Sequence, residues 1–141
     1  MYIFAKRARL CKEWAENIRV CIDKGHISGL EIETIASQGD IKVDTLLPAI
    51  PNLHSHSFQR AMAGMTEYRA RDCESFWTWR DLMYSFLEHL LPEDIMAIAA
   101  MTFLEMQKAG YASVGEFHYI HHSQGGQPYE NAGELSHKIM E

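Results

Sequence analysis

The alternation of apolar and polar positions divides the chain into a strand-rich N-terminal segment and a longer segment in which helical patterns separate strands. Residues 17–23 and 27–32 both alternate apolar and polar side chains, and a Lys-Gly-His turn joins them. This pattern predicts a β-hairpin. A further strand is predicted at residues 41–47, after a polar turn containing glycine. We therefore interpret residues 1–46 as a β-strand segment.

Residues 47–141 show a different pattern, in which apolar runs alternate with helical spacing. The first run, at residues 46–54, is interrupted by Pro48 and Pro51, so it is either a short buried strand or extended chain leading into one. Apolar residues then recur at helical spacing over residues 75–91.

The clearest predicted helix begins at Pro92, a favourable first residue, and stops at Gly110. Its apolar stripe comprises Ile95, Ile98, Ala99, Thr102, Phe103 and Met106. Residues 111–120 predict a second buried strand, and residues 134–141 begin another helix. The order strand, helices, strand, helix predicts an α/β fold with a parallel sheet and right-handed crossovers.

Composition and charge exclude several classes of protein. The chain has 141 residues and a formal charge of −6, without a basic run, which argues against a nucleic-acid surface. Its longest strongly apolar run, residues 95–104, is about half of what a bilayer span needs. Cys11, Cys21 and Cys73 lack the spacing of a zinc or redox motif, which favours free thiols in a reducing compartment. We expect a soluble, cytoplasmic protein that binds neither nucleic acid nor membrane.

His54 and His56 are the main candidates for chemistry. Residues two apart in an extended chain point to the same face, so both rings can approach one point. The strand end of an α/β fold is where active sites gather, and neutral imidazole is a favoured zinc ligand. The spacing alone leaves two interpretations open, a metal site or two half-exposed loop histidines.

The remaining candidates are ambiguous from the residues alone. His118, His121 and His122 lie at or just past the second predicted strand, where packing, loop and substrate-contact roles all remain open. On an extended chain His118 and His121 would face opposite ways. Arg80 follows several aromatic residues and is either part of a solvated helix face or the partner of a carboxylate.

Three longer stretches carry a resemblance to a known family. Residues 47–67 (LPAIPNLHSHSFQRAMAGMTE), 75–84 (SFWTWRDLMY) and 105–122 (EMQKAGYASVGEFHYIHH) resemble the formimidoylglutamate deiminases, which belong to the amidohydrolase superfamily. Ala49 and Gly115 depart from the expected Gly and Ala, at positions without a proposed functional side chain.

The resemblance implies a metal-dependent hydrolase with a TIM-like (β/α) barrel and a small β-sandwich domain, acting on the small molecule N-formimino-L-glutamate. His54 and His56 match the first two ligands of a divalent metal, with zinc the expected ion. Gln59, Arg80 and Tyr119 match substrate-binding positions. No catalytic acid or base of the family falls within this chain, and the full-length form is expected to be a homodimer.

The length implies that the barrel is incomplete. A full barrel takes about 250 residues and eight strands, whereas residues 47–141 offer two candidate strands and the first β-α units. The family's later histidine and aspartate ligands have no counterpart here, so we expect an inactive N-terminal fragment. Two alternatives remain open: another aminohydrolase of the superfamily, acting on a nucleobase or triazine, or a non-catalytic remnant or module.

Overall fold

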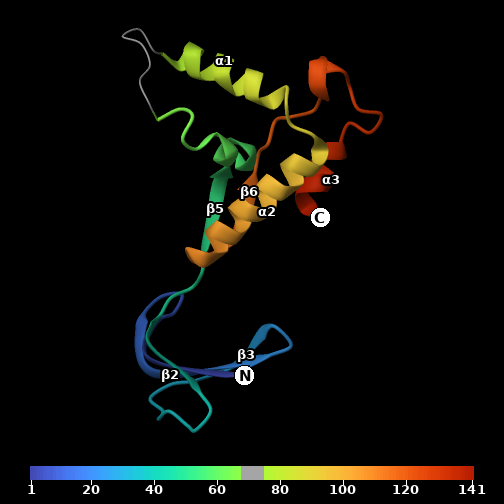
Figure 1. Cartoon of the computed structure of the whole chain (residues 1–141). Coiled ribbons are helices and arrows are strands. Elements are labelled where there is room, and N and C mark those ends of the chain that lie inside the picture. The colour runs from blue at the N-terminus through green and yellow to red at the C-terminus, as the bar shows by residue number, and fades with distance from the viewer. Residues whose placement is uncertain (68–74) are drawn as a thin grey trace. The chain divides into compact units, whose positions relative to one another are not determined.

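The computed structural model describes residues 1–67 and 75–141, which form two compact units, Met1–Ala49 and Ile50–Glu141 (Figure 1). Of the cysteines, Cys11 and Cys21 are free thiols, and Cys73 lies outside the described residues. No helix in the described parts of the chain is long and apolar enough to cross a bilayer.

The first unit is a four-stranded sheet in the order β3-β2-β1-β4. Its strands are β1 (Tyr2–Arg9), β2 (Trp14–Asp23), β3 (His26–Glu31) and β4 (Ile41–Leu46). β1 pairs antiparallel with β2 and parallel with β4, and β2 pairs antiparallel with β3. The predicted hairpin is confirmed, because Asp23 pairs with His26 across a turn in which Lys24 (φ 48°) and Gly25 (φ 80°) are both left-handed. Such a turn matches the twist of the flanking strands.

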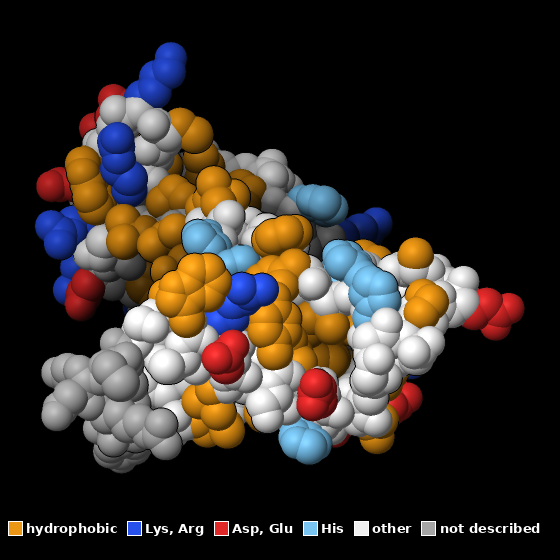
Figure 2. Space-filling view, turned by 90° about the horizontal axis from the view of Figure 1, so that it is seen from above, with side chains coloured by type: hydrophobic (Ala, Val, Ile, Leu, Met, Phe, Trp, Pro, Cys, Tyr) orange, Lys and Arg blue, Asp and Glu red, His pale blue; other side chains and the backbone are white. Residues whose placement is uncertain are grey.

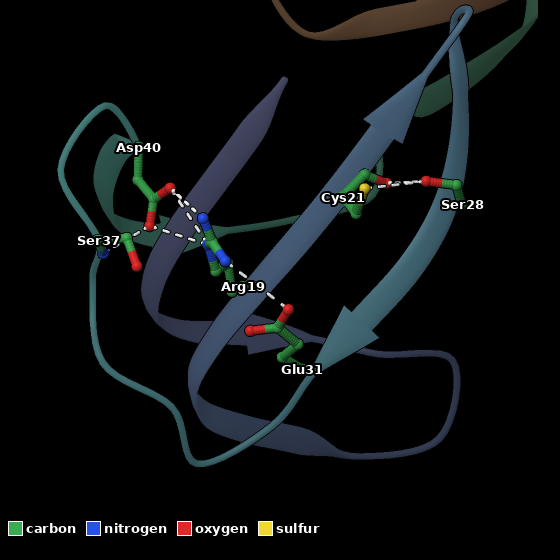
Figure 3. A network of polar contacts seen from close by, with 6 residues as sticks. All are labelled: Arg19, Cys21, Ser28, Glu31, Ser37 and Asp40. Carbon is green, nitrogen blue, oxygen red and sulfur yellow. Dashed lines mark hydrogen bonds and ion pairs between the residues drawn. The ribbon is translucent and has the colours of Figure 1, made fainter.

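The sheet of the first unit buries small and branched side chains, chiefly Ala8, Ile18 and Val20. An ion pair also holds it together: Arg19 donates to both carboxylate oxygens of Asp40 at 2.9–3.1 Å, and the Ser37 backbone N–H donates to the same group at 2.8 Å (Figure 3). Asp40 thereby ties the connection between β3 and β4 to the face of β2.

The second unit contains a parallel pair of strands, β5 (Ile50–Ser55) and β6 (Tyr111–Glu116). In the sequence, β5 is followed by the 3₁₀ helix η1 (Ser57–Met62) and the helices α1 (Phe76–Leu87) and α2 (Pro92–Lys108) before β6 begins. After β6 come the 3₁₀ helix η2 (Gln124–Gly126) and the helix α3 (Glu134–Met140); Figure 1 labels α1, α2 and α3. The predicted parallel α/β arrangement is confirmed. The strand predicted over residues 111–120 is shorter, however, since β6 ends at Glu116.

Local signals set the helix boundaries. Ser75 caps α1 in a capping box with Thr78, and the side chain of Asp94 accepts the Leu91 N–H at the start of α2. Gly110, at φ 96°, follows α2 as predicted. α1 ends at Leu87, earlier than the apolar spacing over residues 75–91 predicted. The helices close over a core of Phe58, Met62, Met83, Ile95 and Leu135.

Candidate metal and substrate site

The two histidines of the H-x-H motif converge at the carboxyl end of β5. Their Nε2 atoms are 3.0 Å apart, and the rings are nearly perpendicular, with centroids 4.8 Å apart. Ser55 lies between them in the sequence and is buried, with 6% of its surface exposed. The alternation of a strand thus brings His54 and His56 to one point, as the spacing predicted.

A backbone carbonyl determines the tautomer of His56. Its Nδ1 lies 2.7 Å from the carbonyl oxygen of Phe117. A carbonyl can only accept a hydrogen bond, so Nδ1 carries the proton and Nε2 presents a lone pair. This is the usual arrangement for a metal-binding histidine, whose second nitrogen donates to a carbonyl or carboxylate.

The pair fits zinc in donor type and spacing. Zinc–imidazole bonds of 2.0–2.1 Å in a tetrahedral site place two nitrogens about 3.3 Å apart, close to the 3.0 Å between the two Nε2 atoms. His54 is exposed, so its ring proton can move to Nδ1 and be solvated there. Within residues 1–67 and 75–141, no group of three or more His, Cys, Asp or Glu residues could hold a metal ion, so the described residues offer this pair without a third ligand.

Gln59 and Tyr119 lie directly beside the imidazoles. η1 begins with the Gln59 N–H donating to the His56 carbonyl at 3.0 Å, and the Gln59 side-chain amide donates to the Tyr119 hydroxyl at 2.6 Å. The Tyr119 ring lies 5.0 Å from the His56 ring and 5.3 Å from Phe58, both edge to face. Burial raises the pKa of Tyr119, so its hydroxyl keeps its proton. The hydroxyl donates to the sulfur of Met83 at 3.4 Å.

Tyr119 adopts an uncommon backbone conformation. Its φ of 44° is left-handed, which costs free energy for a residue with a bulky side chain. Left-handed residues other than glycine also occur at Asn17, Lys24 and Glu33 of the first unit, so the conformation alone does not mark a functional site. Here it accompanies the turn of the chain after β6 that places the ring against His56 and Phe58.

Arg80 lies on α1 and contacts aromatic rings. Its guanidinium carbon is 5.5 Å from the centroid of the Trp77 ring and 5.1 Å from that of Tyr84. Met83, one helical turn later on a neighbouring face, is the α1 residue that touches Gln59 and Tyr119. In the described part of the chain no ion pair or hydrogen bond joins Arg80 to the other predicted site residues. Four of the five predicted residues therefore meet, whereas Arg80 lies one helical turn before Met83 and contacts Trp77 and Tyr84.

The cluster of later histidines differs from the extended-chain prediction. The rings of His118 and His121 lie 5.2 Å apart instead of facing opposite ways, because β6 has already ended at Glu116 and the chain turns at Tyr119. His118 is buried and pairs through Nε2 with the Ser136 hydroxyl at 2.8 Å, and burial lowers its pKa. Both of its ring nitrogens are engaged within the second unit, since Nδ1 accepts the Ile120 N–H at 3.1 Å.

His121 and His122 remain exposed and line an open cavity of about 380 Å³ together with Tyr84 and Tyr119. Figure 2 shows histidine side chains at several places on the surface, among hydrophobic ones. A small polar molecule could reach Tyr119 from this cavity. The substrate-contact interpretation of His121 and His122 thus stays a prediction.

Sequence reasoning missed the residues that support the imidazoles. Glu116 accepts hydrogen bonds from both the backbone N–H and the hydroxyl of Ser57, at 2.8 and 3.0 Å. The side-chain oxygen of Asn52 accepts the His54 backbone N–H at 3.1 Å. The only sequence signal was the position of Glu116 at the end of the second predicted strand, where polar groups of a parallel sheet gather.

No protein-family model matches the chain. Over 138 residues, 97% of its length, it is 46% identical to formimidoylglutamate deiminase from Pseudomonas aeruginosa. The resemblance to the formimidoylglutamate deiminases is confirmed. The chain also matches the crystal structure of an amidohydrolase from Brucella melitensis, with a TM-score of 0.89 and 40% identity over 98% of its length. It spans 30% and 31% of the lengths of these two proteins and fits their N-terminal portion.

Proposed function

We propose that this chain is the N-terminal part of a metal-dependent hydrolase that converts N-formimino-L-glutamate to N-formyl-L-glutamate and ammonia. The observation that carries the proposal is the convergence of the His54 and His56 Nε2 atoms, 3.0 Å apart, in a chain 46% identical to a formimidoylglutamate deiminase. The identity extends over both units of the chain, not over the motif alone.

His54 and His56 would hold a divalent ion, with zinc the expected one. Such an ion, when bound, supplies Lewis-acid activation of water near neutral pH. The Phe117 carbonyl keeps the proton of His56 on Nδ1, which leaves its Nε2 free for the metal. The roles of these residues come from their chemistry and their position at the end of β5.

Gln59, Tyr119 and Arg80 would bind the substrate. The protonated Tyr119 hydroxyl and the Gln59 amide offer hydrogen bonds close to the imidazoles. The planar guanidinium of Arg80 is suited to grip a glutamate carboxylate through two hydrogen bonds. A nucleobase or triazine lacks that carboxylate, so Arg80 favours formiminoglutamate over the other substrates of the superfamily.

β5 and β6 would be the first two strands of a (β/α) barrel, and the first unit would belong to a β-sandwich domain. Two strands do not close a barrel, and a catalytic zinc takes about three protein ligands. We therefore expect the isolated chain to bind zinc weakly and to turn over no substrate. In a full-length cytoplasmic enzyme, expected to be a homodimer, residues outside this chain would complete the site.

A chimera tests the proposal. Residues 1–141 replace the matching portion of the P. aeruginosa deiminase, and ammonia release from formiminoglutamate is measured for the chimera and for the isolated chain after zinc loading. We expect activity from the chimera only, and its loss on His54→Ala or His56→Ala. Ammonia release from the isolated chain would overturn the fragment interpretation, and a folded chimera that deaminates nucleobases instead would overturn the substrate.

A non-catalytic module is the second candidate. It is favoured by the finding that the described residues hold no group of three or more metal ligands. A folded chimera without any hydrolase activity would support it, whereas an active chimera would exclude it.

A further inference from the structure

The ends of β5 and β6 are joined by a continuous set of contacts around His56. The Ser55 carbonyl accepts the Phe117 N–H at 2.9 Å, and His56 Nδ1 donates to the Phe117 carbonyl at 2.7 Å. The Ser57 N–H and hydroxyl both donate to Glu116 Oε1, at 2.8 and 3.0 Å. Residues 55 and 56 are thus tied to residue 117, and residue 57 is tied to residue 116.

The Glu116 contact differs from the others because a side chain makes it. The Ser57 nitrogen belongs to the peptide group that follows His56, so its hydrogen bond to the carboxylate restrains the orientation of that peptide. Hydrogen bonds to a carboxylate are roughly twice as strong as neutral ones. Ser57 is only 2% exposed, and its own carbonyl accepts from the Thr102 hydroxyl of α2 at 3.4 Å.

The same carboxylate is costly for the fold. Glu116 Oε2 is buried and has no hydrogen-bond partner among the described residues. A buried polar atom without a partner destabilises the fold, because the loss of its hydration is not compensated. Residues that are unfavourable for stability in this way concentrate at functional sites.

We propose that Glu116 is a positioning residue for the imidazole pair: through Ser57 it fixes the backbone that carries His56 and so holds the two Nε2 atoms at metal-binding distance. This inference rests on the proposed function, since holding the two Nε2 atoms at this distance matters only if they bind a metal. Among the described residues, Glu116 belongs to no group of three or more side chains that could ligate the ion.

The test compares zinc affinity among variants of the chain. Glu116→Ala should lower the affinity about 10- to 100-fold, the range typical for lost partners of metal ligands. Glu116→Gln keeps an oxygen for Ser57 and should stay within about threefold of the parent. Glu105→Ala is the matched control, because Glu105 likewise binds Arg60 by two hydrogen bonds in the same unit without touching the histidines. It should leave the affinity unchanged.

A second readout does not depend on metal. Nitrogen-15 shifts of the imidazoles report the tautomer of His56 in the metal-free chain. We expect the protonated Nδ1 form in the parent and in Glu105→Ala, and a mixture of tautomers in Glu116→Ala. Should Glu116→Ala fail to fold, Ser57→Ala removes only the hydroxyl contact and keeps the backbone N–H contact to Glu116. It should therefore lower the affinity by a smaller factor, about two- to tenfold.

The two proposals fail separately. If His54→Ala binds zinc as well as the parent, the metal site is wrong, and the tautomer measurement alone then tests whether Glu116 orients His56. If the parent binds zinc through His54 and His56 but Glu116→Ala binds it equally well, with the His56 tautomer unchanged, then Glu116 is only a structural residue.

Discussion

Truncation of Phe58 to alanine tests the packing that supports the candidate site. Phe58 is fully buried (0% exposed), belongs to the core of the second unit and packs edge to face on Tyr119 at 5.3 Å. Removing a buried phenylalanine ring costs about 3–5 kcal/mol, through lost apolar burial and the cavity left behind. Phe58→Leu keeps most of the volume and loses mainly the ring pair, so it should cost about 0.5–1.5 kcal/mol.

The assay is urea unfolding followed by tryptophan fluorescence. Trp14 lies in the first unit and Trp77 and Trp79 in the second, so a Trp14→Phe background makes the signal report the second unit alone. With a slope of about 1.5–2 kcal/mol per molar urea, a loss of 4 kcal/mol lowers the midpoint by about 2–3 M. The slope itself should not change.

Phe117→Ala is the matched control, since that phenylalanine is 63% exposed and its backbone carbonyl is retained. It should change stability by less than about 0.5 kcal/mol. A midpoint for Phe58→Ala within 0.5 M of the control, against the 2–3 M worked out above, would refute this packing and with it the support of Tyr119.

Three further predictions concern other parts of the chain. The Arg19 hydrogen bonds hold the pKa of Asp40 below its usual value. The pair therefore stabilises the first unit above about pH 3.9, and this contribution is lost as pH falls through the folded-state pKa. In thermal melts, the melting temperature of Asp40→Asn should fall less on acidification than that of the parent, whereas Asp44→Asn, whose ion pair is exposed, should behave like the parent. In the chimera, Arg80→Met should raise the KM for formiminoglutamate about 10- to 100-fold with little effect on kcat, because the proposed contact with the substrate carboxylate is equally strong in the ground state and in the transition state. An unchanged KM would contradict the proposed binding of the carboxylate by Arg80. An exposed apolar strand favours association between copies of the isolated chain, and Leu53 of β5 is 83% exposed. Leu53→Thr should therefore lower the association measured by light scattering. Equal association of the variant and the parent would show that β5 is not where the copies meet.

The features that the sequence predicted correctly depend on neighbours along the chain. The convergence of His54 and His56 needs only the two-residue period of a strand. The start of α2 needs only Pro92 and the acidic residues after it, and its end needs only Gly110. Each is a property of a few consecutive residues, which a single sequence displays directly.

The errors arose where distant contacts overrode the local pattern. Residues 117–120 continue the apolar run of β6, but the Phe117 carbonyl is engaged by His56 and Tyr119 turns into the left-handed region. The extended-chain argument for His118 and His121 failed for the same reason. The contact of the Phe117 carbonyl and the turn at Tyr119 cannot be predicted from the residues on either side of Glu116.

The supporting contacts lie 59 to 61 residues apart in the sequence. Ser57 with Glu116, Gln59 with Tyr119 and His56 with Phe117 are all of this kind. They depend on the parallel pairing of β5 with β6, which fixes their register at Ser55 and Glu116. The resemblance named Tyr119 as a site residue, but only the paired strands explain why it lies against the imidazoles.

This dependence also separates what the chain can do from what it needs. The direction and tautomer of the imidazoles are set inside the second unit, by groups on β5 and at the end of β6, so the proposed two-ligand half of a metal site would need no other segment for its orientation. A third ligand for the proposed metal would have to come from outside the described residues, which hold no group of three or more metal-binding side chains. A metal would then be held first by preorganised imidazoles, and residues elsewhere would add affinity and reactivity. We therefore expect the chain to bind zinc weakly, with an affinity that depends on Glu116, and to turn over no substrate.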